Sequence, residues 1–457
     1  MNTADVVPRR RQIPTTAAVF DDNAILVEMV HAPAAKRSAF VVWKDSSWST
    51  ESFVEHDGVR FVPYAPDNNL LRNDVVLFPS EPVEYGTEPA LLAELLAFIH
   101  RYVDLSPLFE RIAAYYVLLS WVYDGFNELP YLRVRGDPGS GKTRFLLVVG
   151  TLVYKPIFAS GASTVSPIFR MLDAIRGTLV IDESDFQQTD ERAEIVKIFN
   201  NGNAKGFPVL RSEVSSKGEY NPRAYSVYGP KIIATRGPFD DRALESRCLT
   251  EEMGGRGVRS DIPINLPDSY KEEALTLRNK LLLFRFRNRS RRLPTEDLVD
   301  RSIEPRLNQI FAPLLAIIED ETARAEIREL ARQYNREMIT ERGMDTEAHV
   351  LEIIRDLAAS YGQRISIKDI TRRFVERYAL EYDRRITTKW IGYVVRRRLR
   401  LATHKSQGNF VIDQEELPKL ERLYERFGIT AETEDIPSPY PWGDLGDLGD
   451  VGTGASV

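Results

Sequence analysis

The sequence predicts an α/β fold: a P-loop domain built on a parallel sheet, with a small β-rich domain before it and a winged helix-turn-helix domain after it. Three observations carry this prediction. A glycine-rich loop, 136–143, follows the apolar run 131–134 and precedes a helical pattern. Strand and helix patterns then alternate, which is typical of a parallel sheet covered on both faces. Residues 345–415 follow the order of a winged helix-turn-helix, three helices and then two short strands.

A chain of 457 residues is too long for one hydrophobic core, so several domains are expected. Short β-rich runs separated by prolines come first, and leucines at helical spacing follow them. The last residues are acidic and rich in proline and glycine, a composition that does not fold alone. The expected segments are a small β-rich domain (1–86), a helical lead-in (87–130), a P-loop domain with a helical lid (131–330), a winged helix-turn-helix domain (345–430) and a disordered acidic tail (431–457).

Composition excludes several classes of protein. No apolar run is long enough for a membrane span and no signal sequence is visible, so we expect a cytoplasmic protein without a membrane partner. The single Cys248 rules out an internal disulfide, and five scattered histidines argue against a zinc site. The net charge of −6 argues against coating of DNA by the whole surface.

The loop at 136–143 has the residues of a phosphate-binding loop. Its glycines allow backbone angles closed to other residues, so successive N–H groups can surround a phosphate at the start of a helix. Lys142 can bridge the β- and γ-phosphates, and the Thr143 hydroxyl can bind Mg²⁺. The residues predicted to bind ATP are Gly136, Asp137, Pro138, Gly139, Ser140, Gly141, Lys142 and Thr143.

Two carboxylates follow the strand predicted at 178–181. An apolar strand that ends in Asp182 and Glu183 places both beside the loop, because ligands of open α/β sheets bind at the carboxyl ends of the strands. Asp182 is predicted to hold Mg²⁺, directly or through water. Glu183 is predicted to polarise the attacking water, which favours hydrolysis over transfer to another substrate.

The next segments predict groups that could complete the site. A hairpin is expected at 207–228, and the following strand, 231–234, ends at Thr235, whose hydroxyl could orient the water. Arg236 is adjacent, and the sequence does not decide which of the two faces the nucleotide. Farther on, Arg306 begins a helix and could reach the same ATP in cis.

An arginine could also act on the ATP of a neighbouring subunit. Arg242 and Arg247 are the two candidates, and we favour Arg247. The alternative is a surface ion pair with one of the nearby acids, Asp240, Asp241 and Glu245.

The order of these motifs resembles the AAA+-like P-loop ATPase domains of phage and plasmid replication proteins, over residues 88–325. The resemblance implies ring assembly, usually hexameric, with ATP at the subunit interfaces and a hairpin directed into a central pore. On this basis Lys217 is the pore residue at the hairpin tip, Thr235 the first sensor and Arg306 the second. The amino-terminal part shows neither a primase active site nor zinc ligands, so primer synthesis by this chain is not expected.

Two arginine-rich segments are interpreted differently. In the segment 281–292 we expect Phe284 and Phe286 in the core and the arginines in solvent. The segment 364–411 contains thirteen basic and four acidic residues, which favours binding to nucleic-acid phosphates. A protein-binding winged helix remains the alternative. The residues predicted to contact nucleic acid in its third helix are Lys389, Arg396, Arg397 and Arg400.

These features lead to a functional hypothesis: an oligomeric, Mg²⁺-dependent ATPase that acts on nucleic acid. A ring-forming DNA helicase, a translocase or a replication-initiation protein of a mobile element fits best. The expected partners are DNA, single-stranded DNA included, further copies of the chain in a hexamer, and replication proteins such as a primase. The alternatives are a nucleotide-switched DNA-binding regulator, a defence ATPase and a helicase loader.

Overall fold

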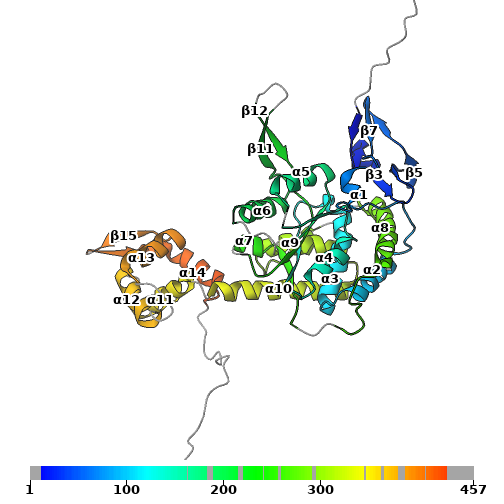
Figure 1. Ribbon diagram of the computed structural model, residues 1–457. Helices are drawn as coiled ribbons and strands as arrows, with labels where there is room; N and C mark the ends of the chain where they lie inside the picture. Colours follow the sequence, from blue (N-terminus) through cyan, green and yellow to red (C-terminus); the bar gives the residue numbers. More distant parts are fainter. Residues whose placement is uncertain are drawn as a thin grey trace, which may run out of the picture. The chain divides into compact units, whose positions relative to one another are not determined.

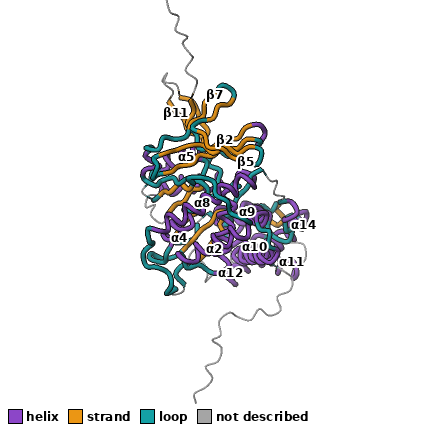
Figure 2. The backbone as a smooth tube through the Cα atoms, turned by 90° about the vertical axis from the view of Figure 1, so that its right-hand side faces the viewer, coloured by secondary structure: helices purple, strands orange, loops and turns teal. Residues whose placement is uncertain are grey.

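The structure is a computed structural model, drawn as a ribbon in Figure 1 and as a backbone tube in Figure 2. It divides into two compact units, Met1–Arg332 and Gln333–Val457, and each is described by itself. None of the helices in the described ranges is long and apolar enough to cross a membrane. The described residues are 12–161, 163–182, 189–214, 220–239, 241–255, 259–290, 295–343, 346–361, 365–378, 386–406 and 408–429.

Two small sheets form the amino-terminal part of the first unit, gathered at one end of it (Figures 1 and 2). Four strands make an antiparallel sheet in the order β2, β3, β4, β5, and β1 pairs with the hairpin of β6 and β7. The strands are β1 (Gln12–Pro14), β2 (Ala17–Phe20), β3 (Ile25–Ala32), β4 (Arg37–Lys44), β5 (Ser47–Glu51), β6 (Val54–His56) and β7 (Val59–Val62).

These strands share their core with the rest of the unit. Val27 and Phe40, from β3 and β4, belong to the same hydrophobic cluster as Tyr131 and Ile157 of the central sheet. Val76 extends the connection through a single β-bridge to Ile157. The β-rich segment therefore covers the central sheet and contributes to its core.

Three helices lead to the central sheet, α1 (Asn69–Arg72), α2 (Glu88–Tyr102) and α3 (Pro107–Trp121). The hydroxyls of Thr87 and Ser106 accept hydrogen bonds from backbone N–H groups in the first turns of α2 and α3, and each helix has a proline at its start. Helix α3 is buried along most of its length, including Trp121. These three helices precede the central sheet in the chain.

The central sheet has five parallel strands in the order β14, β8, β13, β10, β9. The prediction of a parallel sheet in an α/β fold is confirmed. Because all strands run the same way, the carboxyl ends of β8, β10 and β13 meet at one edge. The strands are β8 (Tyr131–Arg135), β9 (Pro156–Ala159), β10 (Thr178–Asp182), β13 (Lys231–Thr235) and β14 (Cys248–Glu252).

Helix α4 packs against β10 and β13 and α5 against β9, whereas α9 packs on α3 (Figure 1). An antiparallel hairpin, β11 (Val209–Val214) with β12 (Tyr220–Tyr225), projects from the unit between α6 and β13 (Figure 1). Its tip, with Lys217, lies outside the described residues. The helices are α4 (Lys142–Gly150), α5 (Val165–Ile175), α6 (Thr189–Gly202), α7 (Arg242–Glu245), α8 (Ser269–Asn288) and α9 (Pro305–Ile317), before α10 (Glu321–Gly343).

Helix α8 corrects one expectation. Phe284 and Phe286 are buried, as predicted. Arg285, expected in solvent, is only 3% exposed. It stays charged in the core because Glu28 and Asp124 both pair with it.

Among its described residues, the second unit packs its own hydrophobic core from four α-helices and a hairpin. Its first two helices are α11 and α12. The third breaks after Tyr393 into a π-helical turn, η6, and the hairpin strands β15 and β16 follow. The elements are α11 (Thr346–Tyr361), α12 (Ile367–Tyr378), α13 (Thr388–Tyr393), η6 (Val394–Arg398), β15 (Thr403–Ser406), β16 (Asn409–Ile412) and α14 (Leu417–Arg426).

Candidate nucleotide site and basic face

The loop at 136–143 connects β8 to α4 at the carboxyl edge of the central sheet. Gly139 and Gly141 have φ angles of 82° and 98°, which only glycine adopts readily. Gly136 is required for another reason, because a β-carbon there would collide with the carbonyl oxygen of Met253. The loop is therefore fixed in a tight turn directly before the amino terminus of a helix, the arrangement that binds phosphate.

Lys142 is the first residue of α4 and is 7% exposed. Its Nζ donates hydrogen bonds to the carbonyl oxygens of Gly136 and Asp137, both at 2.7 Å. The ammonium group thus lies against the loop that precedes it. A phosphate oxygen in the turn could replace these carbonyls as its partner, and a charge-assisted hydrogen bond is the stronger one.

Two buried hydroxyls at this edge have no hydrogen-bond partner among the described residues, Ser140 Oγ in the loop and Thr235 Oγ1 at the end of β13. The backbone of Thr235 adjoins the loop, since its carbonyl oxygen accepts from Gly136 N at 3.3 Å. An unsatisfied buried polar group costs about 1–3 kcal/mol. Two of them beside a phosphate-binding turn indicate a polar ligand or water there. Arg236, the alternative to Thr235, is exposed.

The predicted metal ligands lie on neighbouring elements of the same edge. Asp182 ends β10, where it is the register partner of Ala234 in β13, one residue before Thr235. Thr143 is exposed in the first turn of α4. A carboxylate and a hydroxyl oxygen are donors that suit Mg²⁺. Glu183, the predicted base, lies outside the described residues.

The candidate arginines Arg247 and Arg306 lie at the opposite edge of the sheet. Arg247 immediately precedes β14, and its carbonyl oxygen accepts from Tyr131 N at 2.9 Å, at the start of β8. Arg306 Nη1 donates to Ser246 Oγ at 3.2 Å. The loop at 136–143 follows the other end of β8. Neither arginine is therefore beside the loop of its own chain.

The guanidinium group of Arg247 hydrogen-bonds the side-chain oxygen of Asn200. Burial lowers the pKa of Arg247, and the nearby charge of Arg306 lowers it further. Arg242, in the first position of α7, is exposed and has a partner. Arg247 and Arg306 share no carboxylate in the described part of the chain. These two cations therefore make this edge of the sheet suited to a negatively charged group.

Glu245, one of the acids considered as a surface partner, is occupied by a residue that sequence reasoning missed. Arg133, in β8, is 1% exposed and binds both carboxylate oxygens of Glu245, Nη1 to Oε2 at 2.6 Å. Burial alone would raise the pKa of Glu245, but the hydrogen bonds and charge of Arg133 bring it below its ordinary value. The only available signal was an arginine inside an apolar strand pattern.

In the second unit, the four residues predicted to contact nucleic acid are all exposed: Lys389, Arg396, Arg397 and Arg400. Arg398, between them, pairs with Glu347 at 2.6 Å. The Arg396 guanidinium lies over the ring of Phe410 in the hairpin, 5.1 Å from its centroid. The exposed face of α13 and η6 therefore carries several positive charges.

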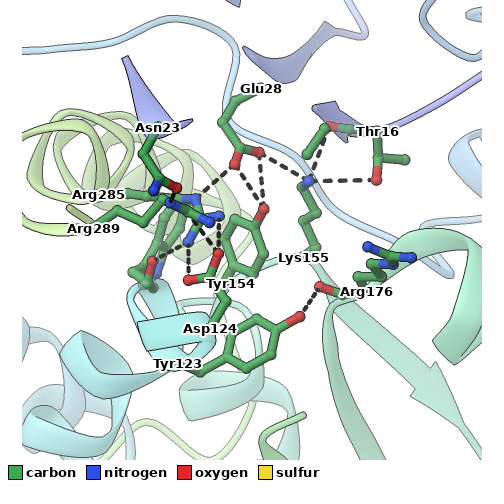
Figure 3. Close-up of polar contacts among 12 residues, drawn as sticks. Thr16, Asn23, Glu28, Tyr123, Asp124, Tyr154, Lys155, Arg176, Arg285 and Arg289 are labelled. Atoms are coloured by element: carbon green, nitrogen blue, oxygen red, sulfur yellow. Dashed lines mark hydrogen bonds and ion pairs between the residues drawn. The ribbon is translucent and has the colours of Figure 1, made fainter. Parts of the chain in front are cut away.

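A second buried polar cluster lies elsewhere in the first unit (Figure 3). The carboxylate of Glu28 pairs with Lys155 Nζ at 2.8 Å and Arg285 Nε at 2.6 Å, and it accepts a hydrogen bond from Tyr154. Arg285 also pairs with Asp124 at 3.0 Å. Burial alone would raise the pKa of Glu28, but the charges of Lys155 and Arg285 outweigh burial and lower it. This cluster connects β3 with Tyr154 and Lys155, directly before β9, and with α8.

Comparison with known proteins gives distant likenesses. No family model and no curated protein match the sequence. An apo structure of the NrS-1 C-terminal region aligns with 84% of the chain and 95% of its own, at 11% identity and a TM-score of 0.33. The SCCmec type IV Cch active helicase aligns with 89% of the chain and 95% of its own length, at 12% identity and a TM-score of 0.33. An inhibitor-bound JCV helicase aligns with 60% of the chain and 66% of its own length, at 13% identity and a TM-score of 0.23. All are too distant to assign an activity.

Proposed function

We propose that this chain is an Mg²⁺-dependent ATPase of the AAA+-like P-loop class that acts on DNA, as a ring-forming helicase or replication-initiation protein of a mobile element. The observation that carries the proposal is the set of polar groups at the carboxyl edge of the sheet. There a glycine loop, the amine of Lys142 and the hydroxyls of Ser140 and Thr235, which have no partner in the part of the chain that the structure describes, converge. This set of donors fits a triphosphate.

Each residue at this edge has a role in the proposed hydrolysis. The backbone N–H groups of the loop and Lys142 bind the phosphates and orient them. Thr143 and Asp182 would hold the Mg²⁺ ion, which supplies positive charge to the phosphate oxygens when bound. Glu183 accepts a proton from the attacking water, and Thr235 positions that water through its free hydroxyl.

The opposite edge supports assembly into a ring. Because Arg247 and Arg306 lie at the amino ends of the strands, we propose that they serve the ATP of a neighbouring copy. The cis role expected for Arg306 is replaced by this one. An arginine supplied in trans stabilises charge in the transition state, and closing a ring of identical copies gives every site the same arginine.

Two elements would engage DNA. The second unit has the helix order of a winged helix-turn-helix, with an exposed basic face on α13 and η6. We propose that the hairpin of β11 and β12, which projects from the ATPase unit, is the pore element and that Lys217 contacts the DNA there. A replication partner such as a primase would use other surfaces.

Turnover and strand displacement by the purified chain test this proposal. Lys142→Ala and Glu183→Gln should each lower ATP turnover on the order of 10²–10³-fold, because Lys142 binds the reacting phosphate and Glu183 activates the attacking water. Lys217→Ala should keep basal hydrolysis and lose stimulation by DNA. Lys271→Ala is the control, since its amine makes only an exposed ion pair with Asp74. Full turnover by Lys142→Ala would refute the nucleotide site.

A further inference from the structure

The π-helical turn η6 carries three consecutive exposed arginines, and two of them, Arg396 and Arg398, differ in their neighbours. Arg398 Nε pairs with Glu347 at 2.6 Å, so its charge is used within the unit. Arg396 has no carboxylate or carbonyl partner among the described residues. A π turn inserts an extra residue into a helix and so redirects the side chains that follow it, and such turns are frequent at functional sites.

Two uncharged neighbours nevertheless hold Arg396 in one place. Its guanidinium group lies over the ring of Phe410 in β16, at 5.1 Å from the centroid. It also crosses Gly392 in α13, where an added β-carbon would lie 2.7 Å from Arg396 Nη2. Gly392 leaves the space and Phe410 provides the surface, so the side chain spans the gap between helix and hairpin.

This geometry leaves the donors of Arg396 free. A cation on an aromatic face keeps its N–H edges available, and an arginine fixed in advance loses less conformational entropy on binding. Its planar fork of donors matches the oxygens of a phosphate. Lys405, the cross-strand partner of Phe410, adds an exposed cation to the same face of the hairpin. The surroundings therefore favour an anionic backbone as the ligand.

We propose that Arg396 is a preorganised phosphate contact for duplex DNA, placed by Gly392 and Phe410 as positioning residues. The proposal rests on the proposed function, because it assumes that the second unit binds DNA. It assigns unequal roles to the arginines of η6: Arg396 binds the DNA backbone, whereas Arg398 stabilises the unit.

Gly392 provides a discriminating variant. In Gly392→Ala the new methyl group displaces the far end of a flexible side chain, which the fold tolerates, and alanine favours the helix more than glycine does. The melting temperature should therefore stay equal to that of the wild type or rise. DNA affinity should fall because Arg396 loses its place. A purely structural role for Gly392 cannot give changes of opposite sign.

The test measures binding of the full-length chain, without nucleotide, to a fluorescein-labelled DNA duplex of about two helical turns. Anisotropy is followed between about 50 and 200 mM NaCl. Arg396→Gln should bind about tenfold more weakly and lower the slope of log K against log salt by about one. Gly392→Ala and Phe410→Leu should shift affinity in the same direction. Phe410→Tyr, which keeps the ring, should bind like the wild type.

Arg398→Gln is the matched control from the same turn. It should lower the melting temperature, because Glu347 loses its partner, and leave the salt slope unchanged. If the wild type binds and Gly392→Ala and Phe410→Leu bind equally well, the positioning inference is overturned and the proposed function stands. If the wild type does not bind the duplex, the inference fails together with the proposed DNA-binding role of the second unit, whereas ATP turnover tests the nucleotide site separately. A slope that falls equally for Arg396→Gln and Arg398→Gln also overturns the inference.

Discussion

The first unit contains two buried polar clusters that differ in one respect. Around Glu28 every charge meets an opposite charge, with Lys155, Arg285 and Asp124 joined by distances of 2.6–3.0 Å. At the end of β13 and in the loop beside it, the hydroxyls of Thr235 and Ser140 have no partner within the described residues. Both clusters are desolvated, but only the second has bonding capacity left over.

This difference separates a structural cluster from a binding site. Burying a charge is unfavourable by several kcal/mol unless a partner compensates for it, so a saturated cluster is needed for the fold. An unsaturated one lowers stability, and the fold retains it where a ligand completes it. Substitutions in the two clusters should therefore act on different quantities, stability in the first and turnover in the second.

The largest effect should come from the saturated cluster. Arg285→Ala leaves Glu28 and Asp124 buried without their shared partner, so the free energy of unfolding should fall by about 3–5 kcal/mol. Thermal or urea denaturation measures this. Arg287→Ala, in the same helix, breaks an exposed pair with Glu84 and should change stability by about 0–1 kcal/mol. Equal losses in the two variants would contradict the comparison.

Acid should weaken the same cluster. Burial raises the pKa of Asp124, but Arg285 and Arg289 outweigh burial and bring the pKa to about 2. This folded-state value lies below the ordinary 3.8, so the stabilisation is present above pH 4 and is lost as the pH falls from about 4 to 2. The difference between the two pKa values corresponds to about 2 kcal/mol in the free energy of unfolding.

Asp124→Asn should therefore be less stable than the wild type at pH 7, and the deficit should shrink as the pH approaches 2. Unfolding midpoints measured from pH 7 downward give both curves. Asp57→Asn is a suitable control because that side chain is 89% exposed. A deficit that stays constant with pH would mean that Asp124 is not charged in the fold.

The smallest effect on stability should come from the unsaturated cluster. Thr235→Val keeps the shape and removes a hydroxyl without a partner among the described residues, so the free energy of unfolding should be unchanged or higher by about 1 kcal/mol. ATP turnover should fall about tenfold, the equivalent of about 1.4 kcal/mol in the barrier. If Thr235→Val lowers stability and leaves turnover unchanged, the hydroxyl of Thr235 is structural, like the groups around Glu28.

Local patterns predicted most of the central sheet and the position of its loop. The loop at 136–143, the strand ending at Asp182 and the burial of Phe284 depend on residues close together in the sequence. Arg285 was placed wrongly because its partners Glu28 and Asp124 lie more than 150 residues away. No periodicity reports such a pairing.

The same limit applies to Arg133 and to the break in the third helix of the second unit. Arg133 is stabilised in a central strand because Glu245 pairs with it from beyond β13 and Thr250 accepts a further hydrogen bond. The turn η6 follows a regular helical pattern in the sequence, and its π geometry emerges where the helix meets the hairpin. Glu183 and Lys217 lie outside the described residues and remain predictions.

The common core of the amino-terminal strands and the central sheet has a practical consequence for truncation. A shortened protein that begins at residue 87 would lose Glu28, Val27 and Phe40 together. Lys155 would then be buried without its carboxylate, Arg285 would keep only Asp124 of its two carboxylates, and apolar surface would be exposed. Such a fragment should aggregate during expression. Loss of activity in this fragment would result from misfolding. The contribution of the first 86 residues to catalysis therefore has to be measured by point substitutions at their solvent-exposed positions.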